Sequence, residues 1–188
     1  MSERPYGELV EPWVMTELET IAQTPIFTLR RRRCTCPEDD SRSGSFVYLD
    51  TSDWCNVIAL TADDEIVMIE QFRHGLGAVT LELPGGVVDP GEGPAEACAR
   101  ELREETGYTG GPVQMLGSVS ANPAMQNNHC HVGLIREACL TASTSFDPHE
   151  QIAVRLVPRS EIPALVSRGV IHHSLIVASL YHLSLQSD

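Results

Sequence analysis

The chain has 188 residues, of which 42% are hydrophobic and 21% are charged. This composition suits one globular domain with a sizeable core, and no apolar run approaches the ~20 residues of a membrane span. The formal net charge of −13 argues against a nucleic acid or an anionic membrane as a partner, because both need clustered Lys and Arg. The six cysteines are expected to be free thiols of a cytoplasmic protein, since no secretory leader is recognised.

A zinc site is one alternative use of the cysteines. Cys34 and Cys36 could combine with His129, Cys130 and His131. These spacings are not those of a standard zinc finger or ribbon, so we do not adopt this interpretation.

Residues 1–44 are predicted to form an N-terminal β arm, and residues 45–188 the main domain. Three prolines are expected to break any long element before residue 26: Pro5, Pro12 and Pro25. Ile26–Cys34 is predicted to be a strand. Its run of arginines, Arg30–Arg33, is expected to be exposed and to face acidic groups or a neighbouring subunit.

Three further strands are predicted before residue 75. Pro37–Gly44 has the composition of a turn, and Ser45–Leu49 is expected to close a hairpin with the arginine-rich strand. Cys55–Leu60 and Glu65–Phe72 are expected to follow as an antiparallel meander around a turn at residues 61–64.

The segment Pro94–Thr106 is predicted to be a helix. Proline is favoured in a first turn, and Gly107 supplies a C-terminal stop. At about 100° per residue, five small or apolar residues fall in one stripe that we expect to pack on a sheet. They are Ala95, Cys98, Ala99, Leu102 and Thr106.

Three carboxylates, Glu101, Glu104 and Glu105, are expected to project from one edge of this helix. Like charges so close together repel one another, and the cluster therefore needs a compensating cation. Oxygen ligands without Cys or His suit a hard divalent ion, Mg²⁺ or Mn²⁺, that bridges to substrate phosphates. A solvated acidic helix face is the alternative.

The full spacing of the segment decides between these two interpretations. From Gly86 to Tyr108 the chain reads GVVDPGEGPAEACARELREETGY, which matches GX5EX7REUXEEXGU, where U is apolar or aromatic. On this motif the chain is identified as a member of the Nudix hydrolases. The resemblance implies an α/β/α sandwich, the Nudix fold, with a mixed β-sheet and a loop-helix-loop catalytic motif. It also implies hydrolysis of a nucleoside diphosphate linked to another group, X.

The resemblance further implies roles for single residues. The implied metal ligands are Glu101 and Glu105, with a direct or water-mediated contact from Glu104 and the carbonyl of Gly85. Glu92 and Arg100 would form the ion pair that braces the loop against the helix.

Two segments before the motif resemble the branch of the family that hydrolyses ADP-ribose and nucleotide sugars. They are Gln71–Gly75, QFRHG, and Leu81–Gly86, LELPGG. In that branch the residue matching Arg73 contacts the substrate, and the residue matching Glu82 lies close to the metal site. The alternatives are a strand-end arginine paired with a surface acid and an edge-strand glutamate.

A polar loop at residues 121–128 joins two predicted strands, Val113–Ser120 and His129–Ile135. Pro123 lies near the place where ADP-ribose pyrophosphatases carry a proline that shapes the substrate pocket, but the residues around it depart from that branch. Asn127 has the donors and the acceptor to bind a phosphate or to read a base or sugar edge. The alternative is that Asn127 and Asn128 simply make the turn. The departure leaves the identity of X open.

A longer polar loop at residues 137–151 precedes the predicted strand Ile152–Val157. Ser160 is expected to cap a helix that ends at Gly169. A last helix, from about Ser174 to Leu185, is expected to pack on the sheet through five residues. These are Leu175, Ile176, Ala178, Leu180 and Leu183.

The motif does not identify the general base. Metal coordination engages the oxygens of Glu101 and Glu105, which leaves Glu104 on the helix and Glu150 at the end of the polar loop. We favour Glu150, because similar ADP-ribose pyrophosphatases place a glutamate in this loop and a loop can close over the substrate. His149 is interpreted as a solvent-exposed neighbour.

We therefore predict a Nudix hydrolase that acts on ADP-ribose or a nucleotide sugar and forms a homodimer through its arm. One alternative is a regulator that binds a nucleotide without cleaving it, although such proteins usually lose an acid of the motif. Another is a house-cleaning hydrolase of nucleoside triphosphates or of non-nucleotide diphosphates.

Overall fold

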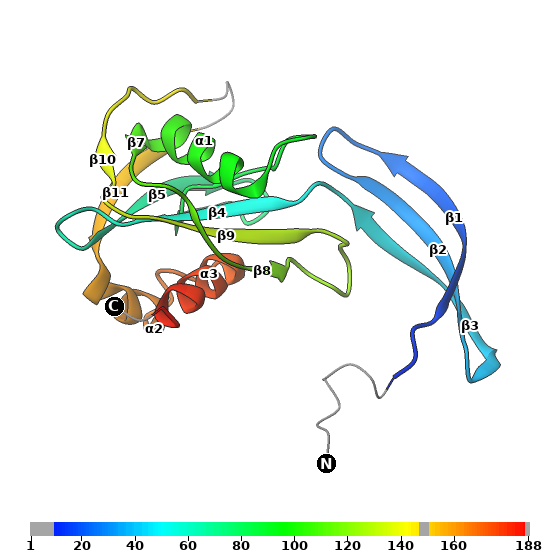
Figure 1. The fold of residues 1–188 in the computed structure, drawn as a ribbon. Coiled ribbons are helices and arrows are strands. Elements are labelled where there is room, and N and C mark those ends of the chain that lie inside the picture. The colour runs from blue at the N-terminus through cyan, green and yellow to red at the C-terminus, as the bar shows by residue number, and fades with distance from the viewer. Residues whose placement is uncertain (1–9, 147–150, 187–188) are drawn as a thin grey trace, which may run out of the picture. The chain divides into compact units, whose positions relative to one another are not determined.

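The computed structural model describes residues 10–146 and 151–186 (Figure 1). Within these ranges the chain divides into two compact units. The arm unit contains residues 10–51 and 122–127, and the main unit contains residues 52–121, 128–146 and 151–186. The boundary predicted at residues 44 and 45 falls within strand β3, Asp39–Asp50.

The arm unit is an antiparallel sheet in the order β1-β2-β3. Its first two strands are β1, Val14–Gln23, and β2, Thr28–Cys36. The predicted hairpin of the arginine-rich strand is confirmed, since Arg30 to Arg33 of β2 pair with Tyr48 to Ser45 of β3.

Two expectations for the arm were wrong. Pro12 and Pro25 flank β1 and do not prevent it, because both lie outside its hydrogen-bonded residues. The predicted turn at residues 37–44 shrinks to Pro37 and Glu38, and β3 begins at Asp39. Polar residues are tolerated in this strand because most of its side chains are exposed.

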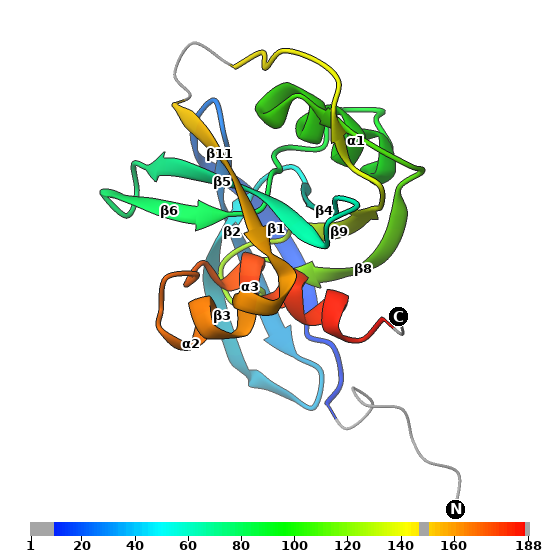
Figure 2. The same cartoon turned by 90° about the vertical axis from the view of Figure 1, so that its left-hand side faces the viewer.

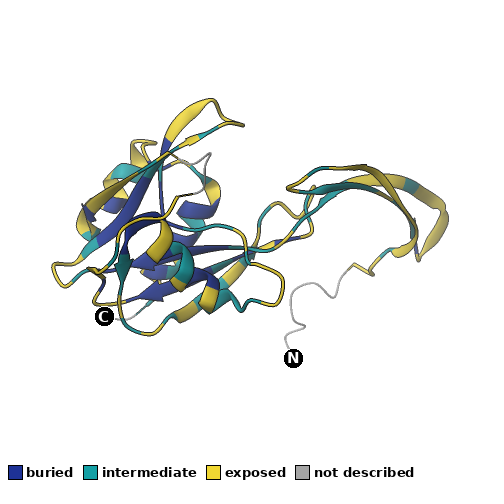
Figure 3. Ribbon diagram, turned by 90° about the horizontal axis from the view of Figure 1, so that it is seen from above, coloured by how far each residue is buried: buried dark blue, intermediate teal, exposed yellow. Residues whose placement is uncertain are grey.

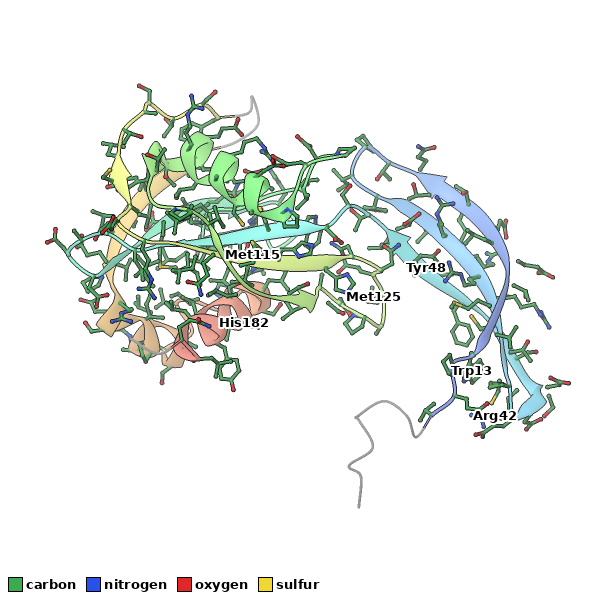
Figure 4. All side chains as sticks on the ribbon, viewed as in Figure 1. Trp13, Arg42, Tyr48, Met115, Met125 and His182 are labelled. Atoms are coloured by element: carbon green, nitrogen blue, oxygen red, sulfur yellow. The ribbon has the colours of Figure 1, made fainter. Side chains whose placement is uncertain are left out.

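The arginines of β2 bind partners within the arm sheet. Arg31 pairs with Glu19 at 3.1 Å, and Arg30 pairs with Asp50. The guanidinium of Arg32 lies 5.0 Å from the ring centroid of Tyr48, which Figure 4 labels. Arg30 and Arg31 therefore face acidic groups, as the sequence predicted, and these groups lie on the neighbouring strands.

The main unit consists of helices on both sides of two sheets (Figures 1 and 2). One sheet is mixed, because β4 runs parallel and β8 antiparallel to the central β9. The other is antiparallel, in the order β11-β5-β6. The strands are β4 Trp54–Ala59, β5 Glu65–Arg73, β6 Ala78–Glu82, β8 Gln114–Ser120, β9 His129–Ile135 and β11 Ile152–Pro158. The short strands β7 Tyr108–Thr109 and β10 Cys139–Leu140 pair with each other.

Helix α1, Pro94–Thr106, covers one side of the mixed sheet. Helices α2, Ile162–Ser167, and α3, Ser174–Ser184, lie on the other side. This arrangement confirms the predicted α/β/α sandwich. No helix in the described ranges is long and apolar enough to cross a membrane.

The predicted meander of β4 and β5 is wrong. Leu60 and Ile66 form a single antiparallel bridge at the turn, and the two strands then enter different sheets. Strand β4 pairs with β9, and β5 pairs with β11 as well as with β6; both β9 and β11 lie far along the chain. Two apolar segments around a short turn favour a hairpin, but the local sequence gives no sign of which distant strands pair.

Strand β4 is buried over nearly its whole length (Figure 3). Its side chains alternate between two cores, as the period of two in a strand requires. The core under α1 includes Cys55, Val57, Ala59, Cys98 and Leu102. The core under α2 and α3 includes Ile58, Leu60, Val132, Ile176 and Leu180. Buried Asn56 of β4 also donates a hydrogen bond to Ser179 of α3 at 3.0 Å. The imidazole ring of His182, labelled in Figure 4, lies where a Cβ on Gly117 would be, so β8 and α3 approach closely.

Helix α1 has the predicted bounds, but its packing face is rotated. Gly107 ends the helix in the left-handed region at φ 74°, and its N–H donates to the carbonyl of Arg103 at 2.9 Å. The buried residues are Ala97, Cys98, Leu102, Glu105 and Thr106. Ala99 is exposed and Ala95 is only half-buried. The predicted face was wrong because the helix has alanines on several faces, so hydropathy alone does not define its buried side.

The C-terminal helices also differ in detail from the prediction. Ser160 belongs to a short 3₁₀ turn, Arg159–Glu161, and the residue that caps α2 is Glu161. In α3 it is Ser179 that is buried, and Ala178 is half-buried. The hydroxyl of Ser179 donates to the carbonyl of Leu175, which removes the cost of burying it.

Candidate active site

Arg100 connects helix α1 to the loop that precedes it. Its Nε donates to Oε1 of Glu92 at 2.8 Å, and its Nη2 donates to Oε2 at 2.9 Å. Nη2 also donates to the carbonyl of Val87 at 3.0 Å. These hydrogen bonds from Arg100 hold the pKa of Glu92 below its usual range.

The three carboxylates of the motif lie around the same junction. Nη1 of Arg100 donates to Glu101 at 2.8 Å and to Glu104 at 3.3 Å. Glu105 is 4% exposed and accepts a hydrogen bond from the backbone N–H of Gly85 at 2.9 Å. The structure therefore pairs Gly85 with Glu105 and joins Glu101 to Glu104 through Arg100, both at the end of the motif loop.

Two glycines allow the motif loop to approach helix α1 and strand β4 closely. A Cβ on Gly86 would lie 2.5 Å from Oε1 of Glu101. A Cβ on Gly85 would lie 2.1 Å from the backbone carbonyl of Cys55. Any larger residue at Gly86 would displace the Glu101 carboxylate, so the glycine is needed for the geometry of the cluster.

The donor atoms at the junction fit a hard divalent ion. They are carboxylate oxygens and a backbone carbonyl, with no nitrogen or sulfur. Across residues 10–146 and 151–186, no three His, Cys, Asp or Glu side chains are grouped closely enough to hold an ion as they stand. The guanidinium of Arg100 supplies positive charge to Glu101 and Glu104, so a bound ion would compete with it for these oxygens.

Arg73 and Glu82 are bound to each other. Nε of Arg73 donates to Oε1 of Glu82 at 3.0 Å, and Nη2 donates to Oε2 at 2.7 Å. Glu82 is 1% exposed, and its carboxylate also accepts a hydrogen bond from the hydroxyl of Thr80. Burial opposes its ionisation, but these hydrogen bonds outweigh burial and lower the pKa of Glu82.

Asn127 and Pro123 belong to the arm unit. The amide of Asn127 donates to Asp50 at 2.7 Å and accepts from the backbone N–H of Thr51 at 3.2 Å. Both ends of the side chain are therefore used to hold the loop against the end of β3, which is the turn role that the sequence left open. Glu150 and His149 lie outside the described residues.

A cluster around Asp53 was missed by the sequence analysis. Its carboxylate accepts hydrogen bonds from the backbone N–H of His129 at 2.8 Å and pairs with the His131 ring at 3.0 Å. Its backbone carbonyl accepts from Val88 at 2.9 Å, which places it at the start of the motif loop. The histidines were visible as a polar stretch, but nothing in the sequence marked Asp53 as their partner.

Comparison with known proteins gives this junction its context. The model of the NUDIX domain matches residues 55–178. The chain belongs to the Nudix family. It is thus a Nudix hydrolase, an enzyme that cleaves acid anhydrides containing phosphorus, and members of the family generally need a divalent metal ion.

Two relatives cover most of this Nudix hydrolase. An ADP-ribose pyrophosphatase of Bacillus subtilis (strain 168) is 29% identical over 131 residues, which is 69% of this chain and 71% of the relative. An ADP-ribose pyrophosphatase of Mycobacterium tuberculosis (strain ATCC 25618 / H37Rv) is 30% identical over 169 residues, 86% of this chain and 78% of the relative. The crystal structure of an ADP compounds hydrolase superposes with a TM-score of 0.80 at 18% identity. It covers 93% of this chain and 94% of its own, which shows that the fold is shared.

Proposed function

We propose that this Nudix hydrolase cleaves the diphosphate bond of a nucleoside diphosphate linked to a second group, and that ADP-ribose is its best substrate. The observation that carries the proposal is the loop-helix junction, where Glu105 binds the N–H of Gly85 and Arg100 joins Glu101 and Glu104. Every acid of the motif is present, which favours an enzyme over a regulator that only binds. The relatives named ADP-ribose pyrophosphatase support the substrate class.

In the proposed mechanism, Glu101 and Glu105 are the chief ligands of Mg²⁺ or Mn²⁺, with Glu104 and the Gly85 carbonyl beside them. When bound, the ion supplies Lewis-acid polarisation of a phosphoryl oxygen and lowers the pKa of water. Arg100 fixes the loop through Glu92, so that Gly85 and the helix keep their spacing.

Water is the nucleophile of the proposed reaction. A bond forms between the water oxygen and one phosphorus, and the bond from this phosphorus to the bridging oxygen breaks. ADP-ribose then gives AMP and ribose 5-phosphate, and the proton of the water passes to a general base, Glu150 or Glu104. Arg73 is proposed to contact the substrate, since its side chain is 43% exposed and carries a permanent charge.

We further infer a homodimer built by the arm unit. Large apolar side chains of its sheet are exposed, and exposed apolar surface of this kind is typical of an interaction site. They include Val14, Met15, Leu18, Phe46 and Val47. We also infer a cytoplasmic location, because the six cysteines are free thiols. Sedimentation velocity of the full chain tests the dimer: a monomer at micromolar concentration would contradict it.

A hydrolysis screen tests the substrate. ADP-ribose, GDP-mannose, UDP-glucose, NADH and diadenosine polyphosphates are each incubated with Mg²⁺ and with Mn²⁺. We expect ADP-ribose to have the highest kcat/KM and to yield AMP and ribose 5-phosphate. In H₂¹⁸O the label found in AMP or in ribose 5-phosphate identifies the attacked phosphorus. Hydrolysis of nucleoside triphosphates alone, or binding of ADP-ribose without turnover, would overturn the proposal.

A further inference from the structure

His173 lies beside the Arg73–Glu82 pair and has no role in the site described so far. It is the residue that caps α3, and its Nδ1 is 3.9 Å from Oε2 of Glu82. This distance is beyond that of a hydrogen bond. Nδ1 is buried and has no hydrogen-bond partner in the part of the chain that the structure describes. Buried polar atoms without a partner are rare and call for an explanation.

Three charged or titratable groups act on the His173 ring: Glu82 from β6, Arg73 from the end of β5, and the adjacent His172. Burial is the main reason that the pKa of His173 is lowered. Glu82 acts in the opposite direction, while Arg73 and His172 lower the pKa further. Burial and the nearby Arg73 thus both favour the neutral ring.

Glu82 and Arg73 differ in their access to solvent. The Glu82 carboxylate is 1% exposed, whereas the Arg73 side chain is 43% exposed. Glu82 occupies the Nε–H and one Nη2–H of Arg73, so this edge of the guanidinium meets a substrate phosphate only if the pair opens. If Arg73 turns to the substrate, a buried carboxylate loses its cation, which is strongly unfavourable without a replacement.

We propose that His173 is a positioning residue: it binds the Glu82 carboxylate in place of Arg73 when Arg73 turns to the substrate. The ring accepts a proton from solvent, because 39% of its side chain is exposed. A ring shift of about 1 Å then lets the Nδ1–H donate to Oε2 at a normal charge-assisted distance. The inference rests on the proposed function, since it is the anionic substrate that draws Arg73 away.

The coupling of His173 to Glu82 is tested by NMR without substrate. The imidazole signals of the seven histidines are followed against pH, and His173 is assigned by its absence in His173→Gln. In Arg73→Ala we expect the pKa of His173 to rise by at least about one unit, because Glu82 then faces the ring without its arginine. Arg73→Lys, which keeps a cation, is the matched control and should give a much smaller rise.

A double variant checks that Glu82 causes the shift. In Arg73→Ala/Glu82→Gln the pKa of His173 is expected to return to the wild-type value. The same pKa in wild type and Arg73→Ala would overturn the inference. Arg73→Gln also removes the positive charge, and it replaces Arg73→Ala if the alanine variant does not fold.

Proton uptake on binding tests the exchange itself. The probe is α,β-methylene-ADP-ribose, and its binding enthalpy is measured at pH 7.5 in buffers of different ionisation enthalpy. We expect the wild type to take up protons and His173→Gln to take up fewer by up to one per site. Binding with equal uptake in both proteins would overturn this inference and leave the proposed function intact. A complete failure of the analogue to bind would count against both.

Kinetics separate this role from a purely structural one. His173→Gln is expected to raise the KM for ADP-ribose by about tenfold at low pH, with a smaller change in kcat. The KM of His173→Gln divided by that of the wild type should approach one as the pH rises through the pKa of His173 in the complex. A ratio that is constant with pH would indicate a structural role and overturn the proposal.

Discussion

Arg100 donates two parallel hydrogen bonds to Glu92, from Nε to Oε1 at 2.8 Å and from Nη2 to Oε2 at 2.9 Å. The same guanidinium reaches Glu101 at 2.8 Å, so one side chain ties the motif loop to a carboxylate proposed to bind metal. A bidentate pair fixes orientation as well as distance. The loop and the helix are therefore expected to lose their mutual geometry together when this arginine is removed.

Arg100→Ala is expected to lower both stability and activity. Arg100 is 29% exposed, and the loss of hydrogen bonds between charged groups should cost about 2 kcal/mol of the free energy of unfolding. For a chain of this size that corresponds to a decrease in Tm of roughly 4–8 °C. Arg103→Ala on the same helix is the control, because the Arg103 side chain has no ion pair among the described residues. Equal melting of both variants would contradict the bracing role.

The contribution of Glu92 should depend on pH in a defined direction. Arg100 lowers the pKa of Glu92 in the folded protein below its value of 4.5 in the unfolded chain. The stabilisation is thus present above this value and is lost as the pH falls through the folded pKa. Urea unfolding of the wild type and Glu92→Gln should show a constant difference between pH 7 and pH 5 that shrinks below about pH 4.5. A difference that persists unchanged at pH 3 would disprove the assignment.

Glu101→Gln and Glu105→Gln are each expected to reduce turnover by more than about 100-fold, because a charged ligand is lost with little change in volume. Both should also weaken the binding of Mn²⁺ in a titration followed by electron paramagnetic resonance. Glu96→Gln is the control: glutamine keeps the hydrogen bond to the N–H of Gly93 that begins the helix. Near-normal turnover of either ligand variant at saturating Mg²⁺ would count against the metal assignment.

The bounds of α1 could be predicted because its signals are local. Pro94 and Gly107 mark the two ends of the helix, and the structure begins and ends it at the predicted residues. The strands β9 and β11 were also predicted almost to the residue, since apolar runs are visible in the sequence. The partners of the strands were not predictable in the same way, because the parallel pairing of β4 with β9 joins segments about 75 residues apart.

The candidate site shows the same limit. The spacing of the motif located the acids, but it gave no indication that Arg73 and Glu82 are bound to each other. That pairing depends on the register of β5 with β6, in which Ile69 lies opposite Glu82. His173 joins them from α3, about 90 residues further along the chain. Contacts of this kind follow from tertiary packing, which no local pattern contains.

Arg73→Ala is expected to raise the KM for ADP-ribose by roughly 10- to 150-fold, the equivalent of about 1.5–3 kcal/mol for a lost charge-assisted hydrogen bond. The structure adds that it should also lower Tm, because buried Glu82 loses its main cation. The two effects separate in a Glu82→Gln background. There, removal of Arg73 should no longer lower Tm but should still raise KM. An unchanged KM in both backgrounds would assign Arg73 to the scaffold alone.

The last prediction concerns the general base, for which Glu104 and Glu150 are the candidates. Glu104 is exposed, and one of its carboxylate oxygens already receives a 3.3 Å hydrogen bond from Arg100. A loop that closes over the substrate can instead bring a carboxylate directly to the attacking water. Glu150 lies outside the described residues, and we assign it the role on the resemblance and on this argument.

Turnover of Glu150→Gln and Glu104→Gln is therefore compared over a pH series, with Mn²⁺ affinity measured in parallel. We expect Glu150→Gln to lose about 10²- to 10⁴-fold in kcat, the usual contribution of general base catalysis, together with the acidic limb of the pH profile. Metal affinity should stay the same in this variant, whereas Glu104→Gln should weaken it. If Glu150→Gln keeps substantial activity and a normal pH profile, the base is Glu104 or no side chain at all.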